Sequence, residues 1–232
     1  MRAREIYRKT RKVPDIFWNA YVCRPIAAVL LASLERTRIT PNQITLLSLV
    51  VTVASAALLV GVPGYAGLVA GIVVFELSYV LDCADGMLAR WRGIASETGH
   101  LLDFLIDEIK AFVVLAAVAF RLFLESSNPW FLEVGLLGLV ALATGIALTT
   151  FLRRPEVAGP RVAGAARSPR RGLGRAIDLL ESAAKFVIHY PSYVLYAALA
   201  GRIDFYLYPY VLVNGLYALR ALSSVALRFG RR

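Results

Sequence analysis

The sequence predicts an all-α membrane protein with six transmembrane helices, preceded by an amphipathic helix at the cytoplasmic surface. Of its 232 residues, 58% are hydrophobic, and the mean hydropathy is +0.62, well above the range of soluble globular proteins. The apolar residues form six stretches, each near the length of about 20 residues that crosses a bilayer. The expected spans are residues 44–60, 68–88, 101–122, 130–152, 176–200 and 205–227.

Residues 1–39 are predicted to form a basic segment followed by an interfacial helix. Pro14 with Asp15 is typical of a helix start, because Pro suits the first turn and Asp favours the positive end of the helix. Aromatic residues mixed with arginines then suit a helix in the headgroup layer. A short re-entrant segment over residues 26–34 is the alternative.

The first span is expected to open at Thr40, since Thr can cap a helix whose first residue is Pro, here Pro41. Residues 40–232 contain no internal repeat, so they are predicted to form one six-helix transmembrane domain. The linker over residues 153–174 is rich in Pro and Gly and is expected to be an irregular loop.

The net charge of +10 is distributed in a way that indicates membrane topology and no nucleic-acid partner. Basic residues precede the first span, follow the second and fourth, and end the chain. An even number of spans places all four groups on one side, so both termini are expected in the cytoplasm. Cys23 and Cys83 fall on that side, where thiols stay reduced, and free thiols are expected.

The predicted second span ends with an acidic stripe. Asp82 and Asp85 share one helix face with Gly86 and Ala89, at spacings of i, i+3, i+4 and i+7. Carboxylates and small residues are therefore expected side by side near the cytoplasmic edge of the membrane.

The third span begins with a matching stripe. Gly99, Asp103 and Asp107 recur every four residues and share one helix face. A short turn over residues 91–97 is expected to make the two helices antiparallel neighbours, so that the four carboxylates converge.

Such a cluster is costly at a membrane edge, and no basic residue is expected on either stripe to neutralise all four carboxylates. A bound cation is the expected solution. Oxygen ligands favour Mg²⁺ or Mn²⁺, or Ca²⁺, over zinc, and the cluster has room for two ions. The small residues leave space for a flat ligand such as a nucleotide, whose phosphates Arg90 can reach.

The pattern D-x-x-D-G-x-x-A-R, eight residues, then G-x-x-x-D-x-x-x-D, resembles the signature of the CDP-alcohol phosphotransferase family at every defined position. The resemblance implies a homodimeric six-helix enzyme whose two-metal site, with Mg²⁺ or Mn²⁺, opens to the cytoplasm. It implies that the metal ligands are Asp82, Asp85 and Asp103, with Asp107 as general base and a further candidate ligand. It also implies that the bound CDP moiety is bordered by Gly86, Ala89, Arg90 and Gly99.

The reaction implied is in-line displacement. Asp107 takes the proton of an acceptor hydroxyl, which attacks the phosphorus distal to cytidine, and CMP leaves. The leading hypothesis is a phospholipid-biosynthesis enzyme with CDP-diacylglycerol as donor and a small alcohol as acceptor. One alternative is a soluble donor such as CDP-choline or CDP-inositol, acting on a lipid or soluble alcohol. A distant alternative, a divalent-cation transporter, conflicts with the almost wholly apolar residues 112–120.

Several other ionisable residues are candidates for weaker roles. Arg153, Arg154 and Lys185 could bind the phosphate of a second substrate, and snorkelling to the interface explains Lys185 equally well. The other arginines of the linker could bind that phosphate or anionic lipid headgroups, but membrane topology alone already predicts arginines there. Glu76 is expected to be a buried, hydrogen-bonded acid. His189 is expected to pack between helices.

Overall fold

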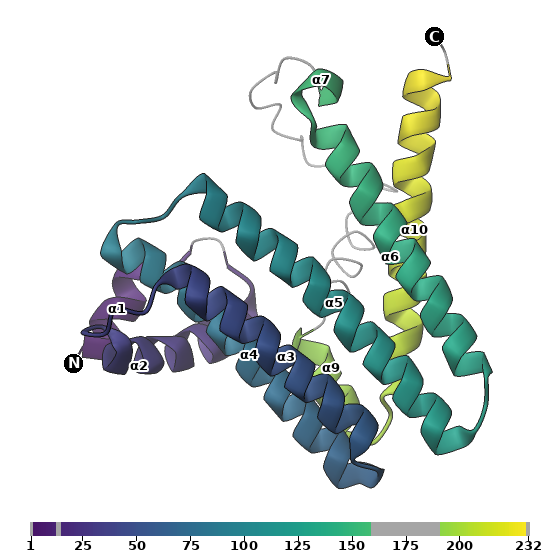
Figure 1. Ribbon diagram of the computed structural model, residues 1–232, viewed down its shortest axis with the longest axis horizontal. Coiled ribbons are helices and arrows are strands. Elements are labelled where there is room, and N and C mark those ends of the chain that lie inside the picture. Colours follow the sequence, from purple (N-terminus) through teal and green to yellow (C-terminus); the bar gives the residue numbers. More distant parts are fainter. Residues whose placement is uncertain (1, 13–14, 159–190, 231–232) are drawn as a thin grey trace, which may run out of the picture.

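The computed structural model describes residues 2–12, 15–158 and 191–230, and this part of the chain is helical and contains no strand (Figure 1). The elements are α1 (Arg2–Thr10), the π-helical turn η1 (Asn19–Cys23), α2 (Arg24–Leu34), α3 (Pro41–Gly61), α4 (Gly64–Arg92), α5 (Glu97–Ser126), α6 (Trp130–Arg153), α7 (Pro155–Ala158), α9 (Pro191–Leu199) and α10 (Asp204–Phe229).

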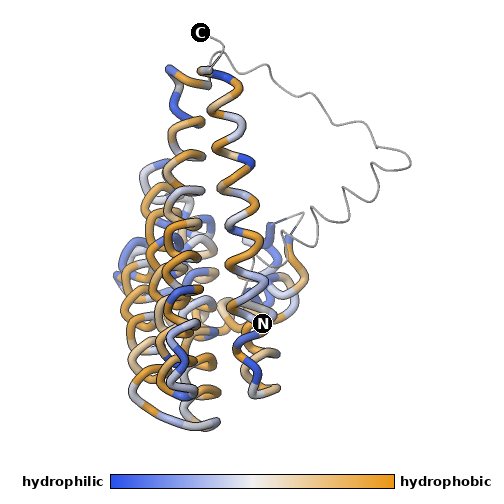
Figure 2. Tube along the Cα trace, turned by 90° about the vertical axis from the view of Figure 1, so that its right-hand side faces the viewer, coloured by the Kyte–Doolittle hydropathy of each residue, from blue (hydrophilic) through white to orange (hydrophobic). Residues whose placement is uncertain are grey.

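Four of the described helices, α3, α4, α6 and α10, are long and apolar enough to cross a membrane. Their outer faces carry large exposed apolar side chains, such as Val50 on α3, Leu136 on α6 and Leu212 on α10. Figure 2 shows hydrophobic residues along nearly the whole length of the long helices. Since a soluble monomer rarely exposes so much contiguous apolar surface, lipid chains are the natural surroundings, and the chain is an integral membrane protein.

The other two predicted spans differ in how far the structure describes them. The third corresponds to α5, a helix of 30 residues that has charged side chains in its middle and is not among the four apolar helices. The fifth lies mostly outside the described residues, and α9 is its described end. The count of six spans therefore stays a prediction.

Capping residues set where the helices around the future site begin. Thr40 Oγ1 accepts a hydrogen bond from the backbone N–H of Gln43, and the Gln43 side chain accepts one from the Thr40 N–H. The predicted start of the first span is thus confirmed. Helix α4 ends at Gly93, whose φ of 67° suits a residue without a side chain. Ser96 then caps α5.

The N-terminal segment differs from the sequence prediction. The expected helix start at Pro14 was wrong, because the first helix is α1 and the next helical residues begin only after Ile16; Pro14 itself lies outside the described residues. Ile6 of α1 is fully buried in a cluster with residues of α2 and α4. Thr10 is also buried, and Ala3 and Tyr7 pack against the same cluster. A segment with few apolar residues is therefore packed as a helix against the rest of the protein.

Helix α3 packs against both α4 and α5, whereas the backbones of α4 and α5 lie farther apart and the two helices meet through side chains such as Asp82 and Lys110. Buried hydroxyl groups join α3 to α4, with Thr52 Oγ1 2.7 Å from Ser78 Oγ and Ser55 Oγ donating to the Gly71 carbonyl at 2.7 Å. Such bonds can hold helices together in lipid, where apolar contacts alone provide little driving force. The two acidic helices, α4 and α5, were expected to pack directly against each other. Instead, both pack against α3, and a cavity lies between them.

The far end of this bundle is fixed by Arg121 of α5, whose side chain is 2% exposed. Its guanidinium donates to the carbonyls of Leu59 at 2.8 Å and Gly64 at 2.6 Å, on either side of the α3–α4 turn. It also pairs with Glu125. At the opposite end, Cys23 and Cys83 are buried free thiols, as predicted.

Candidate active site

A cavity of about 850 Å³ lies beside the C-terminal half of α4. Its wall combines residues of α3, α4, α5, α6 and α10 with residues of the N-terminal segment. The cavity is large enough for a nucleotide with part of a second substrate. Most of the predicted site residues line it: Asp82, Asp85, Gly86, Ala89, Arg90, Gly99, Asp103, Asp107 and Arg153.

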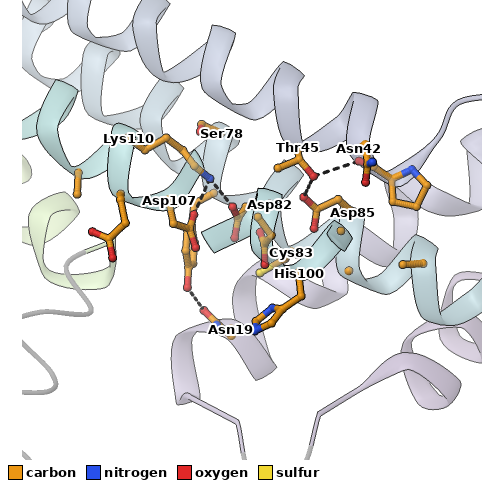
Figure 3. A pocket seen from close by; sticks show the side chains of 18 of the residues that line it. Asn19, Asn42, Thr45, Ser78, Asp82, Cys83, Asp85, His100, Asp107 and Lys110 are labelled. Carbon is orange, nitrogen blue, oxygen red and sulfur yellow. Dashed lines mark hydrogen bonds and ion pairs between the residues drawn. The ribbon is translucent and has the colours of Figure 1, made fainter. Parts of the chain in front are cut away.

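Three of the four aspartates come together inside the cavity. Asp82, Asp85 and Asp103 each offer a carboxylate oxygen, and these oxygens lie within 4.8 Å of one another. Asp85 is 4% exposed, and its Oδ2 accepts a hydrogen bond of 2.5 Å from Thr45 Oγ1 of α3 (Figure 3). Asp103 Oδ1 is buried and has no hydrogen-bond partner in the described part of the chain. The group offers oxygen atoms only, and hard divalent cations prefer such ligands.

Asp107 is not one of this group of three carboxylates and pairs with Lys110, a residue that was not predicted from the sequence. The ammonium group lies between two carboxylates, paired with Asp82 and 2.9 Å from Asp107 Oδ1 (Figure 3). The Lys110 side chain is 4% exposed, whereas that of Asp107 is 51% exposed. The expectation that no basic residue serves the stripes was therefore wrong: position 110 continues the face of positions 103 and 107 by one turn.

The predicted nucleotide-contacting residues Gly86, Ala89, Arg90 and Gly99 form part of the cavity wall. A methyl group added at Gly86 would lie 3.3 Å from Nη1 of Arg90, and one at Gly99 would lie 3.1 Å from Ser96 Oγ. Both positions therefore keep the backbone accessible from the cavity. Arg90 is held at its Nε, which donates to the Thr10 carbonyl at 3.0 Å.

The remaining predicted residues divide into three groups. Arg153 lines the cavity, with its guanidinium carbon 6.0 Å from the ring centre of Phe104, whereas Arg154 is exposed and is not part of the described lining. Lys185 and His189 lie outside the described residues. Glu76 is hydrogen-bonded as predicted, since its Oε2 accepts from Trp18 Nε1 at 3.2 Å.

The structure adds cavity residues that carried little signal in the sequence. Thr45 reaches Asp85 from another helix, and Lys12, Asn19 and Arg24 come from the N-terminal segment. On the opposite side, α5, α6 and α10 contribute a polar wall that includes Glu108, Thr149, Asn214 and Tyr217. These contacts depend on how distant helices pack, which periodicity within one helix cannot reveal.

Comparison with known proteins gives one family and one fold. A family model described as CDP-alcohol phosphatidyltransferase matches residues 38–201, more than half of the chain. A search of curated proteins gave no significant match. Among solved structures, the chain resembles Mycobacterium tuberculosis phosphatidylinositol phosphate synthase with CDP-DAG bound, at 23% identity and a TM-score of 0.55, covering 88% of this chain and 94% of that one. The apo form of that synthase gives 23% identity, a TM-score of 0.54 and coverages of 87% and 94%.

Proposed function

Because the chain belongs to the CDP-alcohol phosphatidyltransferase family, it is an enzyme that transfers a substituted phosphate group from a CDP-alcohol to an acceptor alcohol, and we propose that the donor is CDP-diacylglycerol and the acceptor a small polar alcohol. Such a reaction belongs to phospholipid biosynthesis and releases CMP. Soluble donors such as CDP-choline or CDP-inositol are the alternative.

The main observation that supports this donor is a polar cavity with clustered carboxylates, which lies between helices whose outer faces are apolar. A lipid-linked donor suits these surroundings, because its acyl chains can remain in the bilayer while its nucleotide enters the cavity. The mycobacterial synthase with a similar fold has CDP-DAG bound, which supports the same donor here.

One or two divalent cations, either Mg²⁺ or Mn²⁺, are proposed to bind at Asp82, Asp85 and Asp103. The residues fit such an ion, because the ligand atoms are all carboxylate oxygens within 4.8 Å of one another. The buried, unpartnered Oδ1 of Asp103 is a further sign of fit. When bound, the metal neutralises phosphate charge and stabilises the charge that develops during transfer.

Asp107 is proposed as the general base and as a further candidate ligand. Its half-exposed carboxylate lines the cavity, where an acceptor hydroxyl can approach, and Lys110 holds it from the buried side. After losing its proton, the acceptor oxygen attacks the phosphorus distal to cytidine, and CMP departs. A positioned base typically contributes about 10²- to 10⁴-fold in rate.

The nucleotide is proposed to lie along Gly86, Ala89 and Gly99, where small residues leave room, with Arg90 at its phosphates. Arg153, on the far side of the cavity, is proposed to meet a phosphate of the acceptor. Arg154 and Lys185 are kept as weaker proposals for that role.

The membrane arrangement proposed is six spans, with both termini and the cavity facing the cytoplasm. Residues 40–232 would be the transmembrane catalytic domain, and residues 1–39 a basic, interfacial extension. The helix cap at Thr40 and the basic segments support this division. A homodimer is proposed from the family resemblance.

Purified full-length protein should release CMP when given CDP-diacylglycerol, Mg²⁺ or Mn²⁺ and an acceptor from a panel of alcohols, and EDTA should stop the release. CDP-choline in place of CDP-diacylglycerol tests the soluble-donor alternative. Absence of CMP with every donor, together with Mn²⁺ uptake into proteoliposomes, would instead support a transporter. Beyond Lys110, however, α5 continues with the fully buried apolar residues Val114, Leu115 and Val118, which offer an ion no path.

A further inference from the structure

The N-terminal segment precedes residues 38–201, the range that the family model matches, yet it forms one wall of the cavity through Lys12, Asn19 and Arg24. This wall is fixed to the rest of the protein. The Tyr79 hydroxyl of α4 donates to Asn19 Oδ1 at 2.9 Å, and Arg90 donates to the Thr10 carbonyl. The segment is therefore a built part of the site.

Arg24 is the unusual member of this wall. Its side chain is only 5% exposed, and its Nε donates to the carboxylate of Asp15, which is 10% exposed. Its Nη1 is also buried but has no hydrogen-bond partner among the described residues. A guanidinium has five N–H donors, and leaving one unpaired in a buried position is costly. An oxyanion in the cavity would satisfy it.

The surroundings of Arg24 also favour an anion. The guanidinium of Arg90 lies close enough for the two positive charges to repel each other, with Asp15 and Asp85 as the nearby opposing charges. Lys12, which is exposed, lines the same cavity. Three cationic side chains thus line this cavity, and two of them come from the N-terminal segment.

We propose that Lys12 and Arg24, together with Arg90, form a phosphate-binding subsite on the N-terminal wall of the cavity. The inference rests on the proposed function, in which the cavity holds a diphosphate donor beside an acceptor alcohol. The recognised group is a phosphate oxyanion, for which guanidinium and ammonium groups are the usual protein partners. It belongs either to the diphosphate of the donor or to a phosphorylated acceptor alcohol.

The test uses two variants that remove the N-terminal charges. Lys12→Gln alters an exposed side chain and should leave the fold intact. The double variant Asp15→Asn/Arg24→Gln removes the buried guanidinium without leaving its carboxylate partner charged. Arg8→Gln is the matched control for Lys12→Gln, because Arg8 is also exposed on the N-terminal segment but is not in the cavity lining.

Inorganic phosphate is titrated by calorimetry into Mg²⁺-loaded, full-length protein in detergent. We expect measurable binding by the unaltered protein, about tenfold or greater weakening in both charge-removing variants, and no change in Arg8→Gln, since a charged hydrogen bond typically contributes that much. Equal phosphate affinity in the unaltered protein and Lys12→Gln would overturn the proposal. So would a lack of phosphate binding by the unaltered protein.

CMP-release kinetics then identify the source of the phosphate. A raised KM for CDP-diacylglycerol in the charge-removing variants assigns the subsite to the donor, whereas a raised KM only for phosphorylated acceptors assigns it to the acceptor. Both results support the subsite, and unchanged KM values for all substrates contradict it. If the unaltered protein releases no CMP at all, the proposed function fails, while the phosphate titration still decides on the subsite.

Discussion

Replacing Thr45 by Val should weaken metal binding without touching any proposed ligand. The change keeps the shape of the side chain but removes the hydroxyl that donates to Asp85 Oδ2 at 2.5 Å. Thr45 is 3% exposed, so water cannot easily replace the lost donor. The same hydroxyl lies 3.2 Å from the Pro41 carbonyl, which is the second contact that the variant loses.

The expected size follows from the charge of the acceptor. A hydrogen bond to a charged group contributes about 1.5–3 kcal/mol, equivalent to a factor of about 10 to 150 in an equilibrium constant. Loss of a partner that orients a metal ligand typically lowers metal affinity about 10- to 100-fold. We therefore expect the Kd of Thr45→Val for Mn²⁺ to rise at least tenfold.

The assay is Mn²⁺ titration of purified protein, followed by electron paramagnetic resonance of the free ion, with Thr52→Val as the matched control. Thr52 lies two turns further along α3, is fully buried, and bonds to neutral partners: Ser78 Oγ at 2.7 Å and the Ser48 carbonyl at 3.1 Å. Both variants should lose stability, but only Thr45→Val should lose Mn²⁺ affinity. Equal weakening in the two variants, or none in either, would refute the assigned role of Thr45.

Three further outcomes are expected. Asp107→Asn should lower the rate of CMP release about 10²- to 10⁴-fold, because the proposed general base is lost; full turnover would exclude it as the base. Gly86→Ala should raise the KM for the CDP-linked donor about tenfold by crowding the space beside Arg90. By contrast, Gly215→Ala, with nothing within 4 Å of the added methyl group and no place in the described cavity lining, should leave that KM unchanged. Arg121→Leu should lower the unfolding free energy by about 1–3 kcal/mol, because the carbonyls of Leu59 and Gly64 lose their hydrogen-bond donor inside the protein; a Tm equal to that of the unaltered protein would contradict this.

Features set within a single helix were predictable from the sequence. The faces that carry Asp82 with Asp85 and Asp103 with Asp107 follow from the helical repeat, and the start of α3 follows from the capping chemistry of Thr40. These features depend on neighbours fewer than eight residues apart. Local geometry therefore decides them before the helices pack.

Features set by packing between helices were not predictable. Periodicity could place Lys110 on the face of Asp107, but its contact with Asp82 depends on how α4 and α5 diverge from α3. The helical state of α1 likewise depends on a pocket for Ile6 between α2 and α4. Tertiary burial outweighed the polar composition of that segment.

The cavity carries both acidic and basic side chains. The clustered carboxylates of α4 and α5 share its lining with Lys12, Arg24 and Arg90. A phosphate alone would be repelled by the carboxylates, so it can approach them only when a divalent cation offsets their charge. The proposed cationic subsite then binds the same phosphate. Removing Lys12 should therefore weaken phosphate binding even when the metal site is saturated, whereas removing Thr45 should act only through the metal.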